Sequence, residues 1–229
     1  MASSPVIAID GPSSSGKGTV ATLVAERLGW HLLDSGALYR GVAWAAAQRG
    51  IDFGDDSTLE LMTRQLVFEI RPGNIRIDGC DVTRAIREEP ISVGSSRVAR
   101  LKPVRDALRI VQVGMRRPPG LVADGRDMGT RVFPAAELKV FLDASVEERA
   151  RRRHKQLIDK GSSVRLCDLF ASLRARDERD RSRSVSPLRA AEDAVMIDTT
   201  EMSISAVVEE VLGHAAERSL TGSGGRRGE

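Results

Sequence analysis

The stretch Gly11-Pro12-Ser13-Ser14-Ser15-Gly16-Lys17-Gly18-Thr19 decides the fold of this chain. It follows the short β-branched run Val6-Ile7-Ala8-Ile9, which is typical of a buried parallel strand. Glycines in such a loop let backbone N–H groups curl around an anion at the N-terminus of the next helix. Apolar residues then recur at helical spacing from Val20 to Leu28 and stop at Gly29. The stretch therefore predicts a phosphate-binding loop between a strand and a helix.

The Gly-x-x-x-x-Gly-Lys pattern is a specific signal, because strand, loop and helix all occur where a phosphate loop requires them. The alternative is a chance match in a turn rich in serine and glycine. Gly18 follows Lys17 where many such loops place the hydroxyl residue that touches magnesium, and Thr19 can supply that hydroxyl one residue later. The Gly-Lys-Gly-Thr form resembles that of nucleoside monophosphate kinases more than that of GTPases.

Composition favours one α/β domain with appendages. The 229 residues with 41% hydrophobic content suffice for a single buried core, and helical and strand patterns alternate along the chain. The net charge is only +3, and the positive charge gathers at 149–153 and 174–183. Such clusters suit either a nucleic acid or a small polyphosphate.

Several features predict a cytoplasmic protein without a membrane partner. Cys80 and Cys167 lie far apart and show no metal-binding or redox spacing, which favours a reducing compartment. The first residues lead into the first strand without the charged and apolar regions of a signal peptide. No apolar run approaches membrane-spanning length.

Further elements follow from periodicity and turn residues. Strands are expected at 30–34, 121–124, 138–142 and 195–198. Helices are expected from 35 to about 50 and from 91 to about 117, the second with a start or kink at Pro103. A further helix is expected to begin at a capping box at 145–148, another to follow a break at 161–163, and a last one to span 204–212. Residues 66–78, with a turn at 72–74, predict an antiparallel hairpin inserted into the parallel fold.

The segment 125–130, which is predicted to form a loop after the strand at 121–124, is the first candidate for a binding site. In doubly wound sheets, ligands bind at the carboxyl ends of the strands, so this strand end places Arg126 beside the phosphate loop. Joining two polyanions requires cations, since one pair of like unit charges at ~4 Å costs about 4 kcal/mol at intermediate dielectric. For any other single arginine, a solvated helix face is the ordinary interpretation.

Four motifs in this order carry a family resemblance: the phosphate loop, and the stretches 34–40 (DSGALYR), 124–130 (DGRDMGT) and 176–183 (RDERDRSR). Together they resemble the bacterial cytidylate kinase family from about Val6 to Leu212. The resemblance implies an α/β fold, a P-loop parallel sheet flanked by helices, with an NMP-binding insertion and a short lid. We expect a single domain over 1–218, with a core at about 5–34, 118–148 and 185–214, an NMP-binding region at about 35–117 and a lid at about 149–184. The glycine- and arginine-rich tail over 219–229 is predicted to be disordered from its composition.

The resemblance also implies a role for each matching residue. The phosphate loop would hold ATP with Mg²⁺ through Gly11, Pro12, Ser13, Ser14, Ser15, Gly16, Lys17, Gly18 and Thr19. The catalytic residues would be Lys17, Asp124, Arg126 and Arg183. The acceptor nucleotide, CMP or dCMP, would be bound by Ser35, Tyr39, Arg40, Ser96, Arg105, Arg126, Asp127, Asp180 and Arg183.

Within that set the implied tasks differ. The acceptor phosphate would be clamped by Arg40, Arg126 and Arg183. Tyr39 would lie against the sugar and base, and Asp180 would accept from the ribose hydroxyls. The base would be read by Ser96, Arg105 and Asp127.

Some assignments stay open. Asp127 either accepts from the amino group of cytosine, which uracil lacks, or braces Arg126. Asp124 either orients a magnesium-bound water or caps the loop. The arginines at 151–153 fit a lid over ATP without indicating which of them touches phosphate. Two positions depart from the family pattern, with Ser14 where glycine is common and Val113 where a basic residue often stands.

The implied reaction is direct in-line transfer of the γ-phosphoryl group of ATP to CMP or dCMP, without a covalent intermediate. One rival is a kinase for UMP, AMP or a small metabolite. Another is an ATPase that binds nucleic acid, but acidic residues interrupt the arginines of 174–183 and few aromatic residues are available for stacking. We expect a monomer that binds ATP, CMP and dCMP and no nucleic acid.

Overall fold

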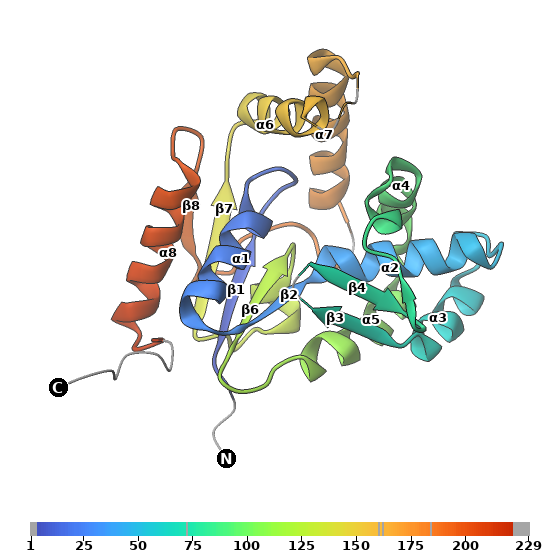
Figure 1. Cartoon of the computed structure of the whole chain (residues 1–229), viewed down its shortest axis with the longest axis horizontal. Coiled ribbons are helices and arrows are strands. Elements are labelled where there is room, and N and C mark those ends of the chain that lie inside the picture. Colours follow the sequence, from blue (N-terminus) through green and yellow to red (C-terminus); the bar gives the residue numbers. More distant parts are fainter. Residues whose placement is uncertain (1–3, 72, 160, 162, 184, 222–229) are drawn as a thin grey trace. The chain divides into compact units, whose positions relative to one another are not determined.

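The computed structural model describes residues 4–71, 73–159, 161, 163–183 and 185–221. The chain divides into two compact units (Figure 1). Unit 1 comprises Met1–Leu32 and Arg116–Glu229, and unit 2 comprises Leu33–Met115. Most of the predicted disordered tail, from residue 222 on, lies outside the described residues.

Strands and helices alternate in much of the chain. The strands are β1 (Val6–Asp10), β2 (His31–Asp34), β3 (Phe68–Arg71), β4 (Asn74–Ile77), β5 (Cys80–Asp81), β6 (Leu121–Gly125), β7 (Leu138–Asp143) and β8 (Val195–Asp198). The α-helices are α1 (Lys17–Leu28), α2 (Ser35–Gln48), α3 (Asp56–Gln65), α4 (Glu89–Val98), α5 (Lys102–Gly114), α6 (Val146–Ile158), α7 (Leu166–Arg181) and α8 (Ile204–Glu217). A 3₁₀ turn, η1 (Ala85–Arg87), and a π-helical turn, η2 (Met128–Val132), complete them.

The main sheet has the strand order β2-β6-β1-β7-β8, so the strand that precedes the phosphate loop is central. The pairs β1–β6, β1–β7 and β7–β8 are all parallel. β1 is buried at every position, as its β-branched run predicts. Apolar side chains of β1, β7, α1 and α8 form one core. The predicted α/β fold with a P-loop parallel sheet flanked by helices is confirmed.

Unit 2 contains the predicted hairpin. β3 and β4 pair antiparallel, and β5 adds a third short strand. The helical pattern over 91–117 divides into α4 and α5, with Pro103 in the first turn of α5, where proline needs no N–H partner. α3 occupies a stretch for which the sequence predicts no element.

Two local predictions need correction. Ser145 does cap α6 by accepting from Glu148 N at 3.2 Å, but its own N–H donates to Thr200 Oγ1 at 3.0 Å, so the reciprocal half of the capping box is replaced by a tertiary contact. The predicted loop 125–130 is partly helical, since η2 begins at Met128. Among the described residues, no helix is both long and apolar enough to span a membrane.

Candidate active site

The phosphate loop joins the central strand β1 to helix α1. Gly16 caps α1 with φ 89°, a left-handed conformation that favours glycine. Gly11 passes so close to β7 that a Cβ there would lie 2.1 Å from the carbonyl oxygen of Leu142. The side chain of Lys17 closes the loop by donating to the carbonyl of Pro12 at 3.2 Å. Ser15 is buried, and its hydroxyl has no hydrogen-bond partner within the described parts of the chain. This loop therefore fits an anion.

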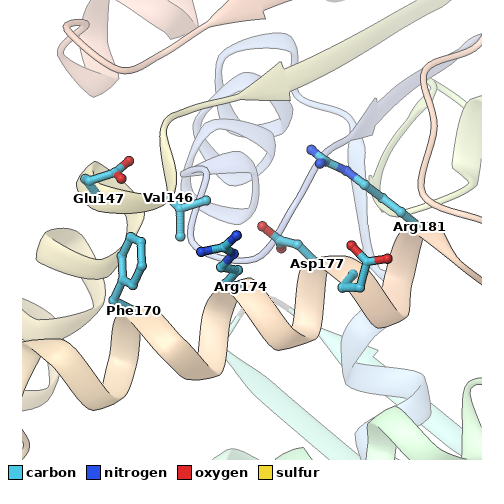
Figure 2. Close-up of a pocket in the computed structure, with 7 residues that line it drawn as sticks. Val146, Glu147, Phe170, Arg174, Asp177 and Arg181 are labelled. Atoms are coloured by element: carbon cyan, nitrogen blue, oxygen red, sulfur yellow. The ribbon is translucent and has the colours of Figure 1, made fainter.

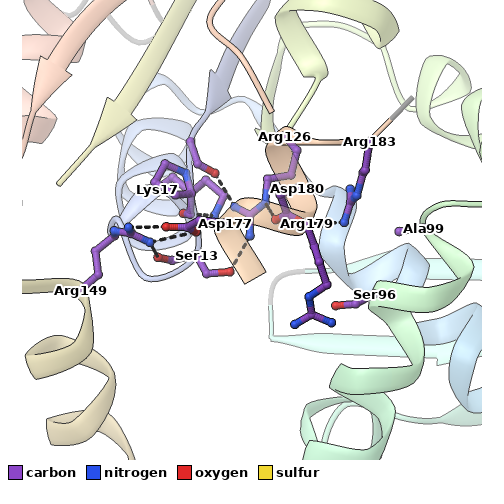
Figure 3. Close-up of polar contacts among 12 residues, drawn as sticks. Ser13, Lys17, Ser96, Ala99, Arg126, Arg149, Asp177, Arg179, Asp180 and Arg183 are labelled. Atoms are coloured by element: carbon purple, nitrogen blue, oxygen red, sulfur yellow. Dashed lines mark hydrogen bonds and ion pairs between the residues drawn. The ribbon is translucent and has the colours of Figure 1, made fainter. Parts of the chain in front are cut away.

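Arg126 lies beside this loop, as its place after β6 predicts (Figure 3). Its guanidinium donates to the carbonyl of Gly11 and, at 2.6 Å, to the hydroxyl of Ser13. Nε donates to Asp180 Oδ2 at 3.0 Å. The other carboxylate oxygen of Asp180 accepts from Arg183. A single carboxylate thus holds two of the predicted phosphate-binding arginines next to the phosphate loop.

Asp180 is only 1% exposed, and both of its oxygens are engaged by arginines. A buried carboxylate of this kind is tolerated because its charge is paired on both sides. In this structure Asp180 therefore orients cations, and its implied contact with ribose stays a prediction.

Three carboxylates cluster near the ends of β1 and β6. Burial raises the pKa of Asp10 to about 7; its hydrogen bonds from Gly129 N and Met128 N lower that pKa, and the charges of Asp127 and Asp124 raise it. All three aspartates are buried. Asp124 lies close to α1, because a Cβ on Gly18 would stand 3.0 Å from its Oδ2. The site thus places acidic oxygens as well as cations around the start of α1.

Arg149 has a structural role that its place in the charged cluster 149–153 does not reveal. It is 1% exposed, and its guanidinium makes a two-point ion pair with Asp177 of α7 (Figure 3). It also donates to the carbonyls of Ser13 at 3.1 Å and Ala144 at 2.9 Å. Arg149 therefore ties the phosphate loop to α6 and α7. The signal that could have revealed it is its place beside Ala150 on the buried face of an otherwise polar helix.

The other arginines of α6 differ in their surroundings. Arg152 donates to Glu148 and to the hydroxyl and carbonyl of Thr199 after β8. Arg151 is exposed, with a loose ion pair to Glu148 at 3.6 Å. Arg153 is half-buried. Of the three, Arg151 has the side chain that is most open to solvent.

A cavity of about 270 Å³ lies between the first turn of α6 and α7 (Figure 2). Its walls combine opposite charges with apolar surface: Val146, Glu147, Phe170, Arg174, Asp177, Glu178 and Arg181. Two arginines face three acidic side chains, so this cavity lacks the excess of positive charge that a triphosphate requires. We therefore place the candidate phosphate site at the loop and not in this cavity.

Unit 2 carries the remaining predicted residues. Arg105 is buried, with its guanidinium carbon 5.4 Å from the ring centroid of Tyr39, which is a cation–π distance. Its Nη1 donates to the carbonyl of Ala99 at 2.9 Å. The packing of unit 2 thus fixes the guanidinium of Arg105.

The start of α2 brings together two charged residues of the DSGALYR motif. Asp34 caps the helix by accepting from Ala37 N at 3.0 Å, and its other oxygen accepts from Arg40 Nη2 at 2.9 Å. Ser35, the first residue of the helix, is buried. Ser96 on α4 is half-buried, and its hydroxyl points to the carbonyl of Ser92 at 3.5 Å.

The central parallel strand, its glycine loop with Lys17, and Arg126 at the end of the neighbouring strand define a P-loop kinase. The model of the family described as Cytidylate kinase matches residues 7–217. Over 224 residues the chain is 54% identical to the cytidylate kinase of Pseudomonas syringae pv. tomato, covering 95% of this chain and 98% of that relative. It is 52% identical over 224 residues to the cytidylate kinase of Stutzerimonas stutzeri, with the same coverage.

The chain therefore belongs to the cytidylate kinase family, which confirms the resemblance found in its motifs. Among solved structures, an uncharacterized protein from Eubacterium ventriosum aligns with a TM-score of 0.52 at 10% identity, covering 93% of this chain and 98% of that one. At that identity the likeness concerns the fold alone.

Proposed function

We propose that this protein transfers the γ-phosphoryl group of ATP to CMP or dCMP, giving ADP and CDP or dCDP. Membership of the cytidylate kinase family supports the substrate class. The observation that carries the chemistry is the group of cations at the phosphate loop, where Arg126 and Arg183 share Asp180. Such fixed cations are what two mutually repelling phosphates require.

The donor would bind at the phosphate loop, from Gly11 to Thr19. The hydroxyl of Ser15, which has no partner among the described residues, and the backbone N–H groups at the start of α1 would donate to its phosphates. Lys17 would exchange its contact with Pro12 for the γ-phosphate. Asp124 and Thr19 offer the oxygen donors that Mg²⁺ prefers, and Mg²⁺, when bound, would neutralise charge on the β- and γ-phosphates.

The acceptor would be recognised by the residues that the family resemblance implies. Its phosphate would be bound by Arg40, Arg126 and Arg183. Tyr39 and Ser35 would contact the sugar side, and Asp180 would retain its implied contact with ribose. The base would be read by Ser96, Arg105 and Asp127, since cytosine presents an amino donor beside ring and carbonyl acceptors. The alternative role of Asp127, bracing Arg126, is tested by the same selectivity measurements.

The phosphoryl transfer needs no covalent enzyme intermediate. A phosphate oxygen of CMP attacks the γ-phosphorus, the bond from that phosphorus to the bridging oxygen breaks, and the electron pair leaves on ADP. The acceptor is already an anion, so no general base is needed for its deprotonation at neutral pH. Lys17, Arg126 and Arg183 would stabilise the charge that spreads over the transferred group.

We also propose a cytoplasmic enzyme that acts as a monomer and without nucleic acid. Separate assays of ADP formation with CMP, dCMP, UMP and AMP test the function. We expect turnover with CMP and dCMP to exceed turnover with UMP and AMP. Phosphorylation of UMP or AMP in preference to both cytidine nucleotides would contradict the proposal, and hydrolysis of ATP stimulated by nucleic acid would favour the rival ATPase.

A further inference from the structure

Four strands of the main sheet end in an aspartate, namely Asp10 (β1), Asp34 (β2), Asp143 (β7) and Asp198 (β8). Three of these carboxylates accept a hydrogen bond from the segment that follows their own strand, through the amides of Ala37, Ala144 and Thr200. Asp10 is different, because its carboxylate accepts from a segment 118 and 119 positions away in the sequence.

The partners of Asp10 are the first two amides of the π-helical turn η2. Met128 N donates to Oδ1 and Gly129 N donates to Oδ2, each at 2.8 Å. The first N–H groups of a helical turn have no partner within that turn. Asp127 precedes the turn, and within the described residues its side chain makes no capping hydrogen bond there. Asp10 therefore caps η2 from the neighbouring strand.

Asp10 also fixes the segment on its other side. In the β1–β6 ladder, Asp10 lies opposite Gly125, the last residue of β6. The backbone is thus held at Gly125 by strand pairing and at Met128 by the carboxylate. Only Arg126 and Asp127 lie between these two attachments, and they are the residues to which phosphate and base recognition are assigned.

The direction of the Asp10 side chain has a physical reason. Asp10 directly precedes the loop that starts at Gly11, whose amides would receive phosphate oxygens. A carboxylate bound to those amides would compete with the phosphates for the same donors. Turned toward Met128 and Gly129 instead, it leaves the loop available and stays hydrogen-bonded although it is buried.

We propose that Asp10 is a positioning residue, which sets the directions of Arg126 and Asp127 and so links the phosphate-loop strand to recognition of the acceptor nucleotide. The inference rests on the proposed function, in which Asp127 reads cytosine. Asp10 itself touches no substrate in this assignment.

The variant Asp10→Asn tests the proposal, because an amide keeps the size of the side chain but presents an N–H group to one of the two backbone donors. Leaving a buried N–H donor unpaired disfavours the native arrangement of the segment by about tenfold or more. We expect KM for CMP to rise about tenfold and the CMP-to-UMP ratio of kcat/KM to fall about tenfold, with KM for ATP within about threefold of the wild type. A matched control is Asp143→Asn, which removes the strand-terminal carboxylate of the neighbouring β7 and should leave all three values within about twofold.

An unchanged CMP-to-UMP ratio in Asp10→Asn, or equal rises in KM for CMP and ATP, would overturn the inference. A wild type that does not phosphorylate CMP would instead overturn the proposed function. If Asp10→Asn does not fold, amide hydrogen exchange on the wild type decides. The proposal requires slow exchange at Met128 and Gly129 that CMP slows further, and exchange there at the rate of exposed amides would contradict it.

Discussion

The ion pairs of the candidate site in unit 1 are less exposed than the Arg40–Asp34 pair of unit 2. In unit 1, the pair Arg149–Asp177 is buried and the pair Arg126–Asp180 is mostly buried, with side-chain exposures of 1%/6% and 17%/2%. In unit 2, the pair Arg40–Asp34 is exposed by 27%/40%. A buried charge is stable only when several hydrogen bonds and ion pairs offset its loss of hydration, whereas water screens the attraction within an exposed pair.

This difference shows which cationic side chains are held in fixed directions before any ligand binds. Unit 1 holds its cations in fixed directions around the phosphate loop, which suits stabilisation of charge during transfer. In unit 2, Arg40 is partly solvated, and of the acceptor-side cations there Arg105 is the one that packing fixes against an aromatic ring. Four experiments test these assignments, and they follow from the largest expected effect to the smallest.

The largest effect is expected on stability from Arg149→Met, which leaves Asp177 buried without its partner. Such a loss costs about 3–5 kcal/mol of unfolding free energy. The double variant Arg149→Met with Asp177→Leu removes both charges and should recover much of that loss. Urea unfolding measures both variants. Arg165→Met, which breaks an exposed pair with Asp168 at the start of α7, is the control and should cost less than about 1 kcal/mol. A single variant as stable as this control would contradict the comparison.

Lys17→Ala should come next, with a loss of kcat of about 10²- to 10³-fold, as expected for removal of a cation that acts on the transferred group. Steady-state assays with CMP and ATP measure it. Arg27→Ala on the same helix is the matched control, because its side chain is 60% exposed and pairs only with Glu209 among the described residues. Turnover by Lys17→Ala close to that of the control would remove Lys17 from the catalytic set.

The buried carboxylate of Asp10 predicts a dependence of stability on pH. Because burial raises the pKa of Asp10 from 3.8 to about 7, the folded state binds this proton more tightly than the unfolded state does. The resulting stabilisation is fully present below pH 3.8 and is lost as the pH rises through about 7. The unfolding free energy of the wild type minus that of Asp10→Asn should therefore fall across this range, by roughly 4 kcal/mol. Denaturation at several pH values measures it, and a difference that grows with pH would contradict the assigned shift.

The smallest effect is expected from Arg105→Ala, which should lower the CMP-to-UMP ratio of kcat/KM by about tenfold, the typical worth of one charged hydrogen bond. Separate kinetics with the two acceptors measure it. Arg109→Ala, one helical turn further along α5 and exposed, is the control and should leave the ratio unchanged. If both variants give the same ratio, Arg105 does not read the base.

Local sequence patterns predict much of the fold. The run at 6–9, the glycine loop and the helical spacing after it predict β1, the phosphate loop and α1 correctly. The hairpin at 66–78 is predicted as well, since turn residues mark its centre. α3 is not, because it has only the three apolar residues Leu59, Leu61 and Met62, and its helix is stabilised by packing against α5.

The sequence predicts which types of residue form the candidate site, but not which of their side chains form ion pairs with one another. Motif order selects Lys17, Arg126 and Arg183, and their family is confirmed. The roles of these residues stay predictions. Whether Asp180 faces two arginines, or which of Arg149 and Arg151 is buried, cannot be read from a run of charged residues. Residues two positions apart on a helix point in nearly opposite directions, and only the tertiary packing decides which of these directions faces the core.

The amino-acid order alone determined that a parallel strand leads into an anion-binding loop, because β-branched runs, glycines and helical periodicity act over a few residues. The tertiary structure alone decided which carboxylate meets which donor. Asp10 reaches Met128 and Gly129 because β1 and β6 lie side by side in the sheet, and no local rule links residues so far apart in the chain.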